Sequence, residues 1–246
     1  MDQYSAMINA LRNGDIRALS RAITLAENDV PLSDQLVNHK NGSNVVGITG
    51  APGVGKSTLI NAYINQLRAD GKTVAVLCVD PSSPTSGGAF LGDRLRMSEH
   101  ANDPGVFIRS LSARNHLGGL CKNIENIIKV IKFTNAWDTI ILETVGAGQS
   151  EVEVAKIANC KIVVLVPGYG DEMQAMKAGI LEIADILIIN KSDMPGAHHS
   201  AKELKAMLRL RPKSDWDVPV LMSTATENEG ICELIETVER FKVSTH

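Results

Sequence analysis

The chain has 246 residues, 44% of them hydrophobic, which is enough for one large α/β domain with a sizeable core or for two small domains. Its 25 Lys and Arg residues and 28 Asp and Glu residues give a formal charge of −3, which argues against a broad nucleic-acid-binding surface. The start of the chain has no signal-peptide core, and no apolar run approaches the ~20 residues of a membrane span. We therefore expect a cytoplasmic protein that binds neither nucleic acid nor membrane.

The cysteine pattern fits a reducing compartment. The four cysteines, Cys78, Cys121, Cys160 and Cys232, are scattered along the chain and form no CxxC pair. Cys78 and Cys160 lie in or beside apolar runs, where a buried free thiol is the expected state.

The first segment, residues 1–40, is predicted to be helical and to pack on the main domain. Leu19 and Ile23 lie at helical spacing, and Asp15 is placed to cap that helix. The turn-like stretch HKNGSN follows. We therefore expect an N-terminal helical segment over 1–40 and a nucleotide-binding domain over 41–246.

From residue 45 onward, strand-sized apolar runs alternate with helical patterns. The strands are continuously apolar, which indicates a sheet covered on both faces. The alternation predicts an α/β fold with three layers and a mostly parallel sheet, whose functional residues lie at the carboxyl ends of the strands. The expected strands are 45–49, 74–80, 106–110, 139–144, 161–166, 186–190 and 218–222. The expected helices are 56–69, 119–132, 151–158, 172–180, 201–210 and 231–241.

A glycine-rich motif follows the first of these strands and opens a helix. GAPGVGKS fits G-x-x-x-x-G-K-[ST], in which glycines let backbone N–H groups surround phosphate oxygens and the helix N-terminus adds donors. Lys56 is expected to reach the β- and γ-phosphates, Ser57 to ligate Mg²⁺, and Thr58 to lie at the α-phosphate. The predicted phosphate-binding residues are Gly50, Ala51, Pro52, Gly53, Val54, Gly55, Lys56, Ser57 and Thr58.

The motif NKSD closes another apolar strand and predicts a guanine site. The carboxylate of Asp193 can accept hydrogen bonds from guanine N1–H and the 2-amino group, whereas adenine would leave it unsatisfied. Lys191 can lay its aliphatic stem over the base, and Asn190 can brace the loop.

A second loop is a candidate for the same base. In PVLMSTATENEGI, the backbone N–H groups around Thr224, Ala225 and Thr226 could face guanine O6. Without the other motifs, a plain loop would be an equally good interpretation of this stretch.

Three carboxylates are candidates for the γ-phosphate end of the site. Asp80 and Glu143 each end a strand, and Asp93 lies in GGAFLGDRLRM. Each could hold Mg²⁺ directly, hold one of its waters or orient the attacking water, and a structural role as a cap or salt-bridge partner is the alternative. Lys56, Asp80 and Glu143 are the predicted catalytic residues. Gly146, in the stretch ETVGAGQSE, is predicted to contact the nucleotide and to act as a hinge.

Together these motifs resemble the MeaB/ArgK family of GTPases, which chaperone cobalamin-dependent methylmalonyl-CoA mutase. The resemblance rests on GAPGVGKST, VDPSSP, IRSLSARNHLGGL, ETVGAGQSE, PGYGDEMQAMKAGI, NKSD and RLRPKSDW, which span nearly the whole chain. It implies a P-loop NTPase of the signal-recognition and metallochaperone class, with GTP or GDP and Mg²⁺ as ligands. It also implies a cobalamin-dependent acyl-CoA mutase as partner, with 167–180 as an additional switch facing it. The chain ends at His246, where family members usually continue into a dimerisation arm, so a homodimer is left open.

Other functions predict other features. A nickel-delivery GTPase of related fold requires a Cys/His cluster, and His198 and His199 lack further ligands at suitable spacing. A kinase or transport ATPase requires ATP preference, against which NKSD argues. A nucleotide-binding regulator with negligible turnover would have the same motifs as a slow GTPase.

Overall fold

The computed structural model describes residues 4–28, 30, 36, 42–81, 98–113, 119–144, 157–168, 180–211 and 215–244. At residues 80, 81, 98, 112, 113, 119–122, 180 and 181 only the backbone is described. The strands are β1 (Asn44–Thr49), β2 (Val74–Pro81), β3 (Val106–Ala113), β4 (Thr139–Thr144), β5 (Cys160–Leu165), β6 (Ile186–Ile189) and β7 (Val220–Met222). The helices are α1 (Ser5–Arg12), α2 (Ile16–Glu27), α3 (Lys56–Ala69), α5 (Gly119–Phe133), α8 (Ile180–Ile183), α9 (Ala197–Leu208) and α10 (Ile231–Ser244), with 3-10 turns η2 (Ser98–His100) and η3 (Ala225–Glu227).

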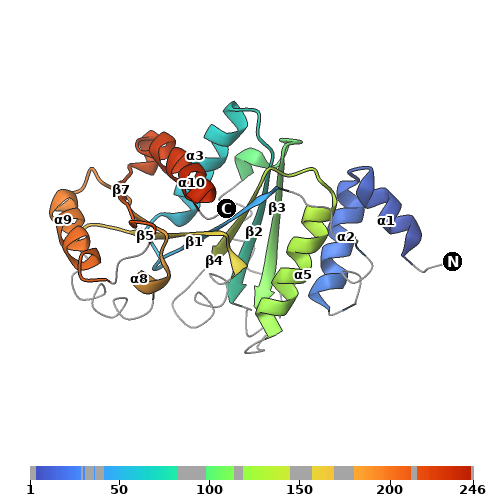
Figure 1. Ribbon diagram of the computed structural model, residues 1–246. Helices are drawn as coiled ribbons and strands as arrows, with labels where there is room; N and C mark the ends of the chain where they lie inside the picture. Colours follow the sequence, from blue (N-terminus) through green and yellow to red (C-terminus); the bar gives the residue numbers. More distant parts are fainter. Residues whose placement is uncertain are drawn as a thin grey trace.

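The seven strands form one sheet in the order β3-β2-β4-β1-β5-β6-β7. Figure 1 shows the sheet with helices packed around it. Every pair is parallel, so all the carboxyl ends meet at one edge. The strand β1 lies at the centre, between β4 and β5. The predicted α/β fold with a parallel sheet is therefore confirmed, and the loop after β1 opens in the middle of the functional edge.

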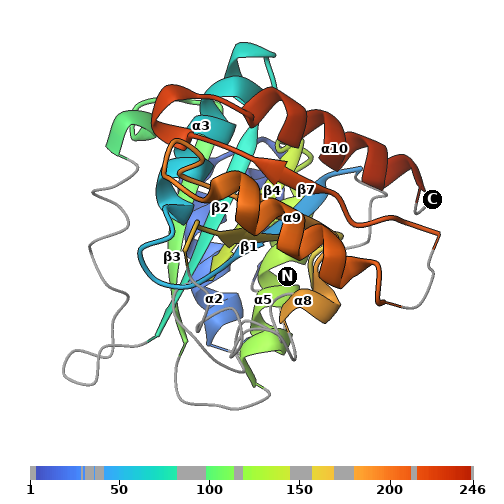
Figure 2. The same cartoon turned by 90° about the vertical axis from the view of Figure 1, so that its left-hand side faces the viewer.

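Helices cover both faces of the sheet, which explains why the strands are apolar throughout. On β2, Val74, Val76 and Cys78 pack in a core formed with α3 and α10. The alternate residues Ala75, Leu77 and Val79 pack in a second core with α1, α2 and α5. A third core joins β5 and β6 to α9, and Figure 2 shows α9 and α10 flanking β7.

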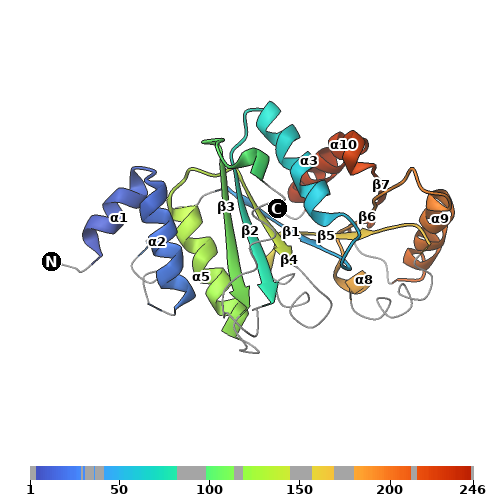
Figure 3. The same cartoon turned by 180° about the vertical axis from the view of Figure 1, so that it is seen from behind.

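The N-terminal helices lie beside α5, next to the β3 edge of the sheet (Figure 3). Asp15 caps α2 as expected, since its carboxylate accepts hydrogen bonds from the backbone N–H groups of Arg17 and Ala18 at 2.7 and 3.1 Å. The Arg109 guanidinium on β3 pairs with the Glu27 carboxylate at 3.0 Å, which ties the end of α2 to the sheet. In the described ranges, no helix is both long and apolar enough to cross a membrane.

Most predicted element boundaries lie within a few residues of those observed, and one helix start was wrong. Helix α9 begins at Ala197 instead of residue 201, because Gly196 adopts a left-handed conformation (φ 90°) that ends the preceding turn earlier. His198 and His199 therefore lie in the first turn of α9, exposed, and do not precede the helix. The predicted helices 151–158 and 172–180 fall almost wholly outside the described residues.

Candidate functional site

The glycine-rich loop between β1 and α3 passes very close to the ends of the neighbouring strands. A Cβ atom on Gly50 would lie 2.3 Å from the carbonyl oxygen of Val164 at the end of β5. A Cβ atom on Gly55, whose φ is 91°, would lie 2.4 Å from the side-chain nitrogen of Asn190. These short distances explain why the motif has glycine at positions 50 and 55. A side chain at either position would push the loop away from the sheet.

The loop leads into an uncapped helix N-terminus. Gly55 is the N-cap residue of α3, and no side chain caps this end. The N–H of Leu59 donates a hydrogen bond to the carbonyl oxygen of Gly55 at 2.9 Å, which begins the helical pattern. The N–H groups of residues 56–58 come before this bond, in the first turn of the helix. The N–H groups of the first turn and the positive end of the dipole make such a terminus suited to a phosphate.

The side chain of Lys56 folds back over the loop. It is 6% exposed, and its ammonium donates hydrogen bonds to the carbonyl oxygens of Gly50 at 2.7 Å and Ala51 at 3.0 Å. The cation is thus held within the loop that would surround a phosphate, where phosphate oxygens are stronger acceptors than peptide carbonyls.

Ser57 and Glu143 meet although 86 residues separate them in the chain. The Ser57 hydroxyl donates a hydrogen bond to Oε1 of Glu143 at 2.9 Å, and the thiol of Cys78 lies 3.7 Å from Oε2. Glu143 is only 1% exposed, and the parallel register places it beside Ile48 on β1 and Cys78 on β2. The sequence predicted the Ser57–Glu143 proximity from strand ends, whereas the contact with Cys78 had no signal in the sequence beyond its place two residues before Asp80.

The donors at this point fit Mg²⁺. A serine hydroxyl and a carboxylate are hard oxygen ligands, and Mg²⁺ usually takes one or two protein ligands and keeps several waters. In the described part of the chain, no group of three or more His, Cys, Asp or Glu residues could hold a metal ion. The backbone of Asp80 ends β2 near this edge. The side chain of Asp80 and the whole of Asp93 and Gly146 lie outside the described residues.

Asn190 joins the NKSD loop to both other loops. Its side-chain N–H donates to the carbonyl oxygen of Val54 at 2.9 Å. Its side-chain oxygen accepts from the hydroxyl of Ser223 at 3.1 Å and from the backbone N–H of Ala225 at 3.2 Å. The residue is 2% exposed, so these contacts form a buried brace between the glycine-rich loop and the loop after β7.

Lys191 and Asp193 of the NKSD loop are exposed. The Lys191 ammonium donates to the carbonyl oxygen of Gly53 at 2.9 Å, and the residue adopts a positive φ of 55°. Asp193 is exposed, as a base-binding carboxylate must be before the base arrives.

The loop after β7 uses two of its three candidate N–H groups within the protein. The N–H of Thr224 donates to the carbonyl oxygen of Glu229 at 3.2 Å, and that of Ala225 donates to Asn190. Thr226 lies inside the 3-10 turn η3. The contact of these groups with guanine O6 stays a prediction, and it would require Ala225 to share its N–H or to exchange partners.

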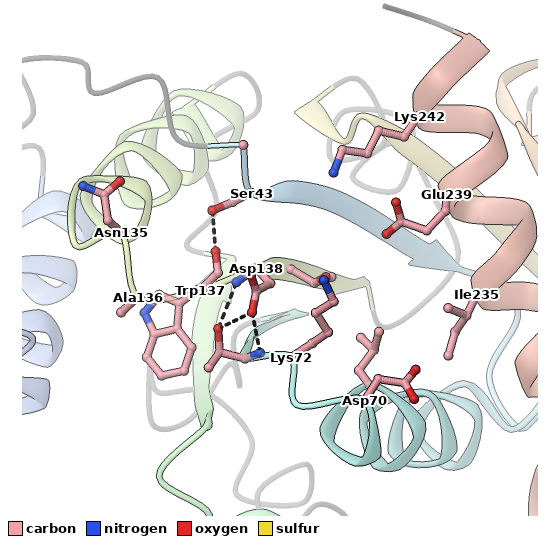
Figure 4. Close-up of a pocket in the computed structure, with 14 residues that line it drawn as sticks. Ser43, Asp70, Lys72, Asn135, Ala136, Trp137, Asp138, Ile235, Glu239 and Lys242 are labelled. Atoms are coloured by element: carbon pink, nitrogen blue, oxygen red, sulfur yellow. Dashed lines mark hydrogen bonds between the residues drawn. The ribbon is translucent and has the colours of Figure 1, made fainter.

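A cavity of about 620 Å³ lies at the opposite, amino edge of the sheet (Figure 4). Ser43 donates to the carbonyl oxygen of Trp137 there at 2.5 Å. The carboxylate of Asp138 accepts from the backbone N–H and hydroxyl of Thr73 at 2.8 and 2.9 Å, and the N–H bond holds the pKa of Asp138 below its usual range. These bonds join the starts of β1, β2 and β4, so this cavity is separate from the loops described above.

The parallel sheet, the glycine-rich loop on an open helix N-terminus and the NKSD loop braced against it define a P-loop nucleotide-binding protein of the GTPase type. The family model "Methylmalonyl Co-A mutase-associated GTPase MeaB" matches residues 19–246. The chain belongs to this MeaB family of GTPases.

Individual relatives agree with this assignment. A relative from Pyrococcus horikoshii is 42% identical over 98% of this chain and 78% of its own length. "GTPase ArgK" from Escherichia coli is 36% identical over 96% of this chain and 75% of its own. "Methylmalonic aciduria type A homolog, mitochondrial" from mouse is 40% identical over 80% of this chain and 48% of its own. A solved structure described as a "LAO/AO transport system kinase" covers 99% of this chain and 76% of its own with a TM-score of 0.80 and 28% identity.

Proposed function

We propose that this member of the MeaB family binds GTP, hydrolyses it to GDP and phosphate with Mg²⁺, and thereby controls the delivery or protection of the cofactor of a cobalamin-dependent acyl-CoA mutase. The observation that carries the nucleotide part is the convergence of three elements. The α3 N-terminus, the Lys56 ammonium and the Ser57–Glu143 pair all lie at the carboxyl edge of the sheet.

The residues at the phosphate end of the site have different proposed roles. Lys56 and the N–H groups at the start of α3 neutralise phosphate charge. Ser57 would hold a Mg²⁺ ion, which would supply positive charge to neutralise the phosphates. Glu143 would hold a water of that ion or orient the attacking water. We assign Asp80, Asp93 and Gly146 to the same region on their sequence positions.

The base-binding part of the proposal rests on Asp193 and Lys191. Lys191 already spans from the NKSD loop to the glycine-rich loop, so its stem lies between the two loops that would enclose the base. Asp193 selects guanine because it accepts from N1–H and the 2-amino group. Competitive titration of the protein with GTP and ATP tests this assignment, and tighter ATP binding would overturn it.

The partner is the part of the proposal that depends most on the relatives. The family description names methylmalonyl-CoA mutase, and the mouse relative is named for methylmalonic aciduria. We assign residues 1–40 to a helical segment packed on a GTPase domain over 41–246, and we place the protein in the cytoplasm. A cobalamin-dependent mutase should bind this protein with an affinity that differs between GDP and a non-hydrolysable GTP analogue. Absence of binding in every nucleotide state, and of any effect on mutase reactivation, would refute the proposal.

The alternative functions require other features. A nickel metallochaperone would need a metal-binding cluster, and the described residues contain none. The kinase description of the similar solved structure predicts a phosphate acceptor and ATP use, which the same titration tests.

A further inference from the structure

The Glu143 carboxylate has a donor on each oxygen, and Ser57 and Cys78, which supply them, belong to different elements. Ser57 at the start of α3 donates to Oε1 at 2.9 Å. The thiol of Cys78, in the middle of β2, lies within hydrogen-bonding distance of Oε2 at 3.7 Å. Cys78 is fully buried, and parallel pairing places it directly beside Glu143.

We propose that Cys78 is a positioning residue for Glu143, an inference that rests on the proposed GTPase function and deepens it. The last torsion of a glutamate side chain is broad and roughly two-fold, so one donor on one oxygen leaves the carboxylate plane free to turn. A second donor on the other oxygen removes this freedom. Cys78 thereby keeps Oε1 directed at Ser57, where the metal and the attacking water are expected.

A thiol suits this task better than a hydroxyl. The S–H group is a weak donor, so it orients the carboxylate while withdrawing little electron density from it. A serine hydroxyl would need an oxygen–oxygen distance of about 3.0 Å or less, and its C–O bond is shorter than the C–S bond, so the carboxylate would have to move by more than roughly 0.7 Å from the 3.7 Å observed for sulfur. Such a movement would pull Oε1 away from Ser57.

The chain offers a matched control in Cys160. It lies on β5 in the same apolar core as Cys78, and it is 1% exposed. Burial raises the pKa of the Cys160 thiol to about 12, so this thiol stays protonated at neutral pH. Cys160 pairs with Val46 on β1, whereas Glu143 pairs with Ile48, two residues further along that strand. Cys160→Ala therefore removes a buried thiol, as Cys78→Ala does, at a position that does not pair with Glu143.

A double-mutant cycle tests the inference. In the full chain, kcat for GTP hydrolysis, the Kd for GDP and the Tm are measured for the wild type, Cys78→Ala, Glu143→Gln and the double variant. Loss of one weak hydrogen bond predicts a kcat lower by about 2- to 10-fold in Cys78→Ala, with the GDP Kd changed by less than about 2-fold. In the Glu143→Gln background the same substitution should have no further effect on kcat. Cys160→Ala should leave kcat unchanged.

Two further measurements keep the inference falsifiable. Cys78→Val fills the space of the thiol without a donor, so it should reproduce the loss in kcat even if the alanine variant folds poorly. The infrared S–H stretching band of Cys78 is identified as the band that is absent in Cys78→Ala. In Glu143→Gln this band should move to higher frequency, because a neutral amide is a weaker acceptor than a carboxylate.

The outcomes separate failure of this inference from failure of the proposed function. A loss of equal size in both backgrounds, an equal loss in Cys160→Ala, or an S–H band that does not respond to Glu143→Gln would overturn the positioning role. A wild-type protein without GTP hydrolysis, or a Glu143→Gln variant of unchanged rate, would instead refute the proposed role of Glu143. The infrared result would then still decide whether the contact exists.

Discussion

Replacement of Asn190 by alanine should weaken both the fold and nucleotide binding. The side chain makes three buried hydrogen bonds, at 2.9, 3.1 and 3.2 Å, to the glycine-rich loop and to the loop after β7. Each bond contributes about 1 kcal/mol, so Asn190→Ala should lower the free energy of unfolding by about 3 kcal/mol. For a domain of this size, that corresponds to a Tm lower by roughly 6–12 °C.

The effect on nucleotide binding follows from the same contacts. Without Asn190, the carbonyl of Val54 and the N–H of Ala225 lose the partner that holds their loops together. The two loops must then be ordered by the nucleotide itself, so the GDP affinity should fall by at least about 10-fold.

Thermal unfolding and calorimetric GDP titration measure these two effects, and Asn159 provides the control. Its side-chain oxygen accepts one hydrogen bond, from the N–H of Val45 at 3.0 Å, at the amino end of the sheet. Asn159→Ala should therefore cost about 1 kcal/mol and leave the GDP affinity unchanged. If Asn190→Ala lowered the Tm no more than Asn159→Ala does and left the GDP affinity intact, the brace would not exist as described.

Three further changes test other parts of the molecule. Lys56→Ala should reduce kcat for GTP hydrolysis at least about 100-fold, because a buried cation at the phosphates is lost; near-normal turnover would contradict its role. Asp193→Asn should reduce the preference for GTP over ATP by about 10- to 100-fold in competition titrations, and an unchanged preference would exclude Asp193 as the base-reading group. Asp138→Asn tests the amino edge of the sheet by Tm measured against pH. The folded-state pKa of Asp138 is lowered, so its stabilisation is fully present above about 3.9 and is lost as the pH falls through the folded-state pKa. Compared with the wild type, Asp138→Asn should have a lower Tm at neutral pH, and its Tm should fall less on acidification. An equal fall in Tm in the wild type and the variant would show that the contact of Asp138 with Thr73 does not stabilise the fold.

The sequence predicted the structure around the candidate site well wherever local backbone conformation determines it. The glycines of the motif GAPGVGKS, followed by a helical pattern, were enough to predict a loop on a helix N-terminus, and α3 occupies the expected range Lys56–Ala69. The apolar strands were also predictable, because burial on both faces leaves a continuous apolar run. The start of α9 was missed, since a glycine that ends a turn and one that lies within it have the same sequence signal.

The contacts of Cys78 and of Asn190 could not be predicted from the sequence. Each joins segments far apart in the chain, 65 residues for Cys78 and Glu143 and 136 for Asn190 and Val54. Which strands are neighbours depends on the order β3-β2-β4-β1-β5-β6-β7. Apolar strands of similar composition fit many orders equally well, so only packing of the whole sheet against its helices selects one.

The sequence by itself therefore determined the glycine-rich loop before α3, the position of Glu143 on a strand and the family to which the chain belongs. The tertiary structure alone decided that Glu143 accepts from Ser57 on one oxygen and from Cys78 on the other. The reason is physical: backbone conformation depends on neighbours in the chain, whereas the orientation of a buried side chain depends on neighbours in space.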